Sequence, residues 1–170
     1  MQKTTRFTQA VNDAAVGYSP YGSPAWQNPP YAITPSDDAA VLQGLDCEVD
    51  SNWLKLTNIA DKLPPGAIPD GVEVCVKAKG EDSGFGGFSF LRVQLCVDGT
   101  VTSEDRASQD WVSNGPAVVK TFGGPADRFG LPLDRDTIND SGFGVGLSVV
   151  GSSGCGVASI FDVEVTIYYH

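Results

Sequence analysis

The chain has 170 residues, a formal net charge of −10 at pH 7 and a sequence pI near 4.3. This length suits one domain with one hydrophobic core. The excess of acidic over basic residues, and the lack of a stripe of Lys or Arg residues, argue against direct binding to nucleic acid. Glycine (20) and proline (11) separate short apolar runs, which favours an all-β fold over a helical one.

The N-terminal region differs in composition from the rest of the chain. It contains prolines at positions 20, 24, 29, 30 and 35, which lack an amide donor and cannot lie within a central strand. We therefore expect residues 1–25 to form an extended N-terminal arm and residues 26–170 to form a β-sandwich domain. The arm residues expected to contact another subunit are Arg6, Phe7, Tyr18, Tyr21 and Trp26. The alternative is that Trp26 and Tyr31 only cover an edge of the sandwich.

The first fifteen residues lack the continuous apolar segment of a signal peptide, and no run approaches the roughly 18 apolar residues of a membrane span. We therefore expect synthesis in the cytoplasm of the cell that translates the chain, and no membrane partner. Under reducing conditions, thiols are expected at Cys47, Cys75, Cys96 and Cys155. The alternative is a late disulfide between Cys75 and Cys96, if their strands pair.

Seven segments after the arm have the apolar alternation or β-branched composition of strands. They are Ala39–Leu45, Trp53–Ile59, Val72–Lys79, Phe88–Val97, Ala117–Phe122, Phe143–Val150 and Val157–Tyr169. Val72–Lys79 and Phe88–Val97 each have one apolar and one polar face, which is typical of antiparallel sheets. The fold prediction is a single antiparallel β-sandwich or jelly roll of about seven to nine strands.

Two segments between the predicted strands are expected to form a helical turn and a surface loop. Asp134 in a capping position and the Gly142 stop predict one turn of helix. The acidic, polar stretch from Thr100 to Pro116 around Trp111 is expected to be a surface loop.

Residues that could support catalysis or bind a cofactor are sparse. The one histidine, His170, is the last residue of the chain, so a nucleophile with a positioned imidazole is not expected. The spacing of Asp134, Asp136 and Asp140 lacks the glycine and glutamate of a calcium loop, so no calcium loop is expected there. We expect no cofactor or metal, and the alternative is calcium at Asp37–Asp38, a pair that is more typical of a turn and cap before a strand. Four aromatic residues could stack on a sugar ring, namely Trp53, Trp111, Tyr18 and Tyr21.

Several short motifs occur in a characteristic order. They are Trp26–Pro29, Ser36–Ala39, Ser51–Asn58, Leu63–Val72, Phe122–Leu131 and Phe143–Val145, followed by Ile167–Tyr169 at the end. In this order and spacing the chain resembles, over about residues 26–169, a β-sandwich module common among structural proteins of tailed bacteriophages. The resemblance implies a jelly-roll-like sandwich carried on virions, without catalytic residues. Two departures are Phe129, where a tryptophan is common, and the glycine-rich strand 143–150.

From this resemblance we expect a non-enzymatic phage virion structural protein, foremost a capsid decoration or cement protein. It would bind the major capsid protein or other virion proteins on the capsid exterior, as a homo-oligomer with a trimer favoured. The alternative is a tail, spike or fibre component that binds a host-surface glycan through loops around Phe85 and Trp111. A carbohydrate-active enzyme is disfavoured because no pair of catalytic carboxylates is evident.

Overall fold

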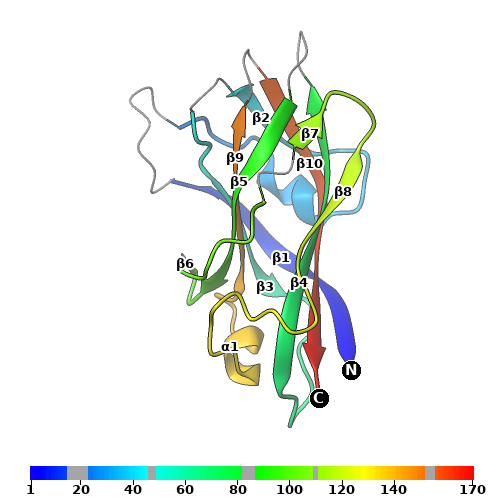
Figure 1. Ribbon diagram of the computed structural model, residues 1–170, viewed down its shortest axis with the longest axis vertical. Helices are drawn as coiled ribbons and strands as arrows, with labels where there is room; N and C mark the ends of the chain where they lie inside the picture. Colours follow the sequence, from blue (N-terminus) through cyan, green and yellow to red (C-terminus); the bar gives the residue numbers. More distant parts are fainter. Residues whose placement is uncertain (15–22, 46–48, 82–86, 109–110, 152–155) are drawn as a thin grey trace.

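The computed structural model describes residues 1–14, 23–45, 49–81, 87–108, 111–151 and 156–170 (Figure 1). Within these ranges the chain is all-β, with ten strands and two short helical turns, η1 (Pro29–Ile33) and α1 (Arg135–Asn139). The strands are β1 (Gln2–Asp13), β2 (Ala40–Leu45), β3 (Trp53–Ile59), β4 (Pro69–Glu81), β5 (Gly87–Val97), β6 (Thr100–Val101), β7 (Trp111–Ser113), β8 (Val118–Gly123), β9 (Gly144–Gly151) and β10 (Gly156–Tyr169).

The strands form one curled antiparallel sheet in the order β6-β5-β9-β3-β1-β10-β4-β8, with β2 added to β10 and β7 to β5. β1, blue in Figure 1, connects the two layers of the sandwich, because Gln2–Arg6 pair with β10 whereas Phe7–Asp13 pair with β3. We call the part with β10, β4, β8 and β2 the β4 layer. The part with β3, β9, β5, β6 and β7 is the β9 layer.

The core lies between the two layers and follows from the alternation in the sequence. Val72, Val74 and Val76 of β4 are fully buried, while the residues between them are partly exposed. Phe90 of β5 meets Phe122 of β8 edge to face, with ring centroids 5.2 Å apart, so an aromatic contact joins the layers. The predicted antiparallel β-sandwich of jelly-roll type is confirmed.

The seven predicted strands are present with ends shifted by at most three residues. The predicted helical turn is α1, where the Asp134 carboxylate accepts a hydrogen bond from the Thr137 amide. The stretch expected as one loop, Thr100 to Pro116, contains the short strands β6 and β7, which pair with β5.

The N-terminal segment differs from the expected arm. Residues 2–13 form β1 within the sheet, where Phe7 is buried and Arg6 pairs with Asp162 and Glu164 of β10. The physical reason is local, because the prolines that suggested an arm begin at position 20 and residues 2–13 carry none. Trp26 is also buried, and its indole donates to the Asn52 carbonyl at 2.9 Å. Tyr18 and Tyr21 lie outside the described residues.

The motif from Phe122 to Leu131 makes a tight corner against the start of β4. The Val72 amide donates to the Asp127 carbonyl at 2.8 Å, and the Gly124 amide donates to the Val72 carbonyl at 2.9 Å. The Asp127 carboxylate accepts two hydrogen bonds from Arg106, at 2.6 and 2.9 Å, and one from the Phe129 amide. Phe129 is fully buried with a φ of 53°, so this network holds a residue in the left-handed region.

Cys75 and Cys96 are free thiols on different layers, and their strands β4 and β5 are not neighbours in the sheet. The alternative of a disulfide between them therefore does not apply to this structure. Burial raises the pKa of Cys96 to about 12, so this thiol is protonated at neutral pH and packs as a small apolar residue. Cys47 and Cys155 lie outside the described residues.

Candidate functional site

The outward face of the β9 layer has no side chains along part of its middle strand. In the register of the sheet, Gly146 of β9 lies between Lys55 of β3 and Gln94 of β5, and Gly144 lies between Thr57 and Cys96. Larger side chains from the flanking strands therefore rise on either side of β9. This arrangement makes the face hollow rather than flat.

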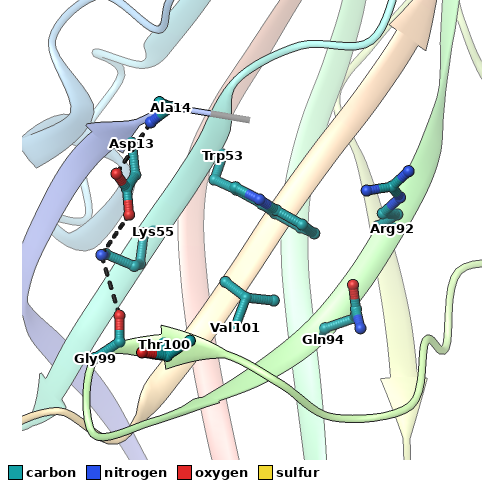
Figure 2. A pocket seen from close by; sticks show the side chains of 9 residues that line it. All are labelled: Asp13, Ala14, Trp53, Lys55, Arg92, Gln94, Gly99, Thr100 and Val101. Atoms are coloured by element: carbon teal, nitrogen blue, oxygen red, sulfur yellow. Dashed lines mark hydrogen bonds and ion pairs between the residues drawn. The ribbon is translucent and has the colours of Figure 1, made fainter. Parts of the chain in front are cut away.

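One open hollow on this face has a volume of about 510 Å³ and is shown in Figure 2. Its residues come from four strands: Asp13 from β1, Trp53 and Lys55 from β3, Arg92 and Gln94 from β5, and Thr100 and Val101 from β6, joined by Ala14 and Gly99. Because these side chains stand mostly on paired strands, their positions are set by the sheet before any ligand arrives.

The Trp53 indole lies across β9 and forms part of the floor of this hollow (Figure 2). A Cβ on Gly146 would lie 3.0 Å from Trp53 Cε3 and 2.8 Å from Val101 Cγ2, so the missing side chain makes room for both. The Arg92 guanidinium carbon lies 5.9 Å from the centre of the indole ring, a cation–π distance. The tryptophan is 5% exposed, so a ligand would touch only the part of the ring that faces the hollow.

Asp13, Lys55 and Gly99 form a polar bridge along one side of the hollow (Figure 2). The Lys55 ammonium donates to Asp13 Oδ2 at 2.5 Å and to the Gly99 carbonyl at 3.1 Å. The hydrogen bond from Lys55 lowers the pKa of Asp13, so this carboxyl is ionised at neutral pH and acts as an acceptor. The bridge ties β1 and β3 to the β5–β6 turn.

A second hollow of about 530 Å³ adjoins the first, because Lys55 and Gly99 line both. Its remaining lining is Gln9 and Val11 of β1, Thr57 of β3, and Asp98, Asp140, Ser141 and Gly142. The Gly99 amide donates to the Gly142 carbonyl at 2.9 Å, which holds the β5–β6 turn against the loop after α1. The two hollows together follow β3 from Trp53 to Thr57.

Trp111, a sequence candidate, lies on the same face as the first hollow. It pairs with Ser89 of β5 and is 42% exposed, while its neighbour Val112 pairs with Phe88 and is buried. Trp111 therefore points outward. Ser89 and Arg92 are three residues apart on β5, a distance of roughly 10 Å along the strand. Because Trp111 pairs with Ser89 and Arg92 lines the hollow, the exposed indole lies beyond one end of the hollow.

The other sequence candidates are distributed differently. Trp53 is in the first hollow, and Phe85 lies outside the described residues. Arg6, Phe7 and Trp26 are built into the sandwich as described above. Sequence reasoning did not single out Asp13, Lys55, Arg92 or Gln94, and the signal that could have found them is the glycine-rich strand 143–150, which leaves space on one face.

Three acidic residues weighed against a calcium loop have local roles. Asp134 caps α1, Asp136 pairs with Arg135, and Asp140 accepts from the Gly142 amide. Among the described residues, no group of three or more His, Cys, Asp or Glu side chains is arranged to hold a metal ion. In the same ranges, no helix is long and apolar enough to cross a membrane.

Comparison with known proteins shows no matching family model and no matching curated protein. Among solved structures, a xylan-binding module, CBM15, aligns with a TM-score of 0.41 and 12% identity over 98% of this chain and 96% of that chain. A putative glycoside hydrolase from Bacteroides vulgatus aligns with a TM-score of 0.41 and 8% identity over 98% of both chains.

A third solved structure, that of infectious bursal disease virus Gt strain, aligns with a TM-score of 0.34 and 13% identity. The alignment covers 93% of this chain and 38% of that chain. These similarities are too low to transfer a function.

Proposed function

We propose that the protein is a non-catalytic carbohydrate-binding protein and that its site is the outward face of the β9 layer. The observation that carries the proposal is the first hollow, where an indole floor is surrounded by charged and amide side chains from neighbouring strands. A sugar ring has apolar C–H faces and a rim of hydroxyls, so it needs an apolar platform together with hydrogen-bond donors and acceptors. The hollow offers the polar groups and a small part of the Trp53 ring on a rigid sheet, and the exposed Trp111 on the same face supplies the larger apolar surface.

The polar groups of the hollow suit hydroxyls. Asp13 is an ionised acceptor, and Arg92 carries guanidinium donors on the opposite side. The Gln94 amide beside Arg92 donates one hydrogen to the Ser103 carbonyl and also carries an acceptor oxygen. Trp111 adds an exposed aromatic surface on the same face. This proposal is the glycan-binding alternative from the sequence, with its working surface moved from loops to the strands of the β9 layer plus Trp111.

Binding without cleavage is the better proposal for this hollow. A glycosidase needs a carboxylic acid whose pKa is raised so that it can protonate the leaving group. Among the described residues that line the first hollow, the one carboxyl is Asp13, and Lys55 lowers its pKa. Its environment therefore favours the charged acceptor over the protonated acid.

The location of the protein remains a prediction. The resemblance to the phage module would place it on a virion. Capsid decoration was expected to act through oligomerisation and through contacts of an arm over residues 1–25, and residues 2–13 of that segment form β1 instead. We therefore favour glycan binding over decoration, and a tail or spike location over the capsid exterior.

The proposal is tested by affinity electrophoresis in native gels that contain soluble xylan, mixed-linkage β-glucan, glycol chitin or host-cell surface polysaccharide. At least one of these should retard the protein. Trp111→Ala and Arg92→Met should each weaken that retardation about tenfold, which corresponds to roughly 1.4 kcal/mol of binding free energy.

A matched control is Tyr31→Ala, since Tyr31 of η1 is 41% exposed, close to the 42% of Trp111, and is not among the residues that line the hollow. Its retardation should equal that of the original protein. No retardation by any of the four polysaccharides, or equal loss in Trp111→Ala and Tyr31→Ala, would contradict the proposal.

A further inference from the structure

The two hollows are separated by one side chain and one turn rather than by a strand. β1 and β3 run without interruption beneath both, with Asp13 and Trp53 at one end and Gln9 and Thr57 at the other. Between them stand Lys55 and the turn at Gly99, joined by the 3.1 Å hydrogen bond. The paired strands β1 and β3 are therefore continuous beneath both hollows, and a chain that occupied both would pass over the Lys55–Gly99 contact.

The length of this floor exceeds one sugar ring. Trp53 and Thr57 are four residues apart on β3, a span of about 13 Å along the strand. Each hollow also has a volume, about 510 and 530 Å³, within the range of roughly 300–1,000 Å³ typical of a small-molecule site. A single terminal sugar would occupy only one of the two hollows.

The second hollow has groups of its own that suit hydroxyls. Gln9 is exposed, and its Oε1 accepts from the Thr57 hydroxyl at 3.4 Å. Val11, 47% exposed, supplies an apolar surface beside them. At the boundary, the Lys55 ammonium has three donors, and the contacts to Asp13 and Gly99 use two.

On the basis of the proposed function, we infer that the ligand is an extended glycan chain that lies along β3 and occupies both hollows, with Lys55 beside its middle. The site selects the interior of a polysaccharide rather than a terminal sugar. Affinity should rise with chain length until both hollows are filled, because each added unit brings new contacts without a second loss of translational freedom.

Isothermal titration calorimetry with two-unit and six-unit oligosaccharides tests this inference. The probes are xylobiose and xylohexaose, cellobiose and cellohexaose, and chitobiose and chitohexaose. One hexasaccharide should bind at least tenfold more tightly than its disaccharide. Gln9→Ala should lower the affinity for the hexasaccharide about threefold and leave the affinity for the disaccharide unchanged, because Gln9 lies in the second hollow.

The matched control is Gln43→Ala, another exposed glutamine, on β2 of the β4 layer, which should change neither affinity. Thermal unfolding of both variants should be unchanged, which separates lost contacts from lost folding. The inference would be overturned if the two-unit and six-unit sugars bound with equal affinity, or if Gln9→Ala left the affinity for the hexasaccharide unchanged. Either result would leave the proposed function intact. If none of the six oligosaccharides bound, the inference would be overturned. If, in addition, none of the four polysaccharides retarded the protein in native gels, the proposed function would be overturned too.

Discussion

Replacing Gly71 by alanine should lower the free energy of unfolding by about 3 kcal/mol, the upper part of the range for forced overpacking. A Cβ on Gly71 would lie 2.4 Å from the Gly124 carbonyl oxygen and 2.5 Å from the Pro125 carbonyl carbon. Both are backbone atoms, and hydrogen bonds from this corner to Val72 hold them in place. The clash therefore cannot be relieved by rotating a side chain. Urea unfolding followed by tryptophan fluorescence measures the loss.

The matched control is Gly124→Ala in the same corner. A Cβ there would meet nothing within 4 Å, and Gly124 is not among the glycines with a positive φ. Its unfolding free energy should stay within about 0.5 kcal/mol of the original, helped by the smaller entropy of the unfolded chain. If the two alanine variants were equally stable, the close approach at Gly71 would be wrong.

Replacing Asp127 by alanine should cost about 2 kcal/mol at neutral pH, because it removes two charge-assisted hydrogen bonds with Arg106 and one with the Phe129 amide. The loss also leaves Arg106, whose guanidinium lies 5.3 Å from the Phe129 ring, without its main partner. Phe129 keeps its left-handed φ of 53° with less support. The difference in urea midpoint at pH 7 measures this cost.

The same pair has a predictable pH dependence. The Arg106 hydrogen bond lowers the pKa of Asp127 below its ordinary value of 3.8, so the folded state favours the ionised form. The contribution of Asp127 is therefore complete above its unfolded pKa and is lost as the pH falls through the lower folded pKa. The original protein and Asp127→Ala should converge in stability toward about pH 2.

Asp136→Ala is the control for this pair. Asp136 pairs with Arg135 at 2.8 Å, but its side chain is 87% exposed, so the ion pair is screened by water. Its removal should change stability little at any pH. Equal losses for Asp127→Ala and Asp136→Ala would show that the corner network adds nothing beyond a surface ion pair.

Local alternation was enough to predict most of the sandwich. In β4, Val72, Val74 and Val76 point to the core and Lys77 and Lys79 point away, as their spacing indicates. β1 was missed because its buried residues, Thr5, Phe7 and Ala10, do not keep one period along the strand. That irregularity accompanies its passage from one layer to the other, which depends on partners distant in sequence.

The candidate site could be predicted only in part. Trp53 and Trp111 were recognisable as aromatic residues able to stack on a sugar. Their common face depends on the pairing of β5 with β7 and β9 and of β9 with β3, which no local pattern contains. The pairing of Asp13 with Lys55 likewise requires β1 to lie beside β3.

The most direct test of the proposed glycan site is an NMR titration that follows backbone amide chemical shifts. The titrant is the hexasaccharide of the polysaccharide that retards the protein most strongly in the gel. If the proposed site is right, the largest changes will fall on the outward face of the β9 layer, at Lys55, Gln94, Gly146 and Trp111, and at Gln9 in the second hollow. Changes confined to outward residues of the β4 layer, such as Lys77, Glu164 and Thr166, would contradict it.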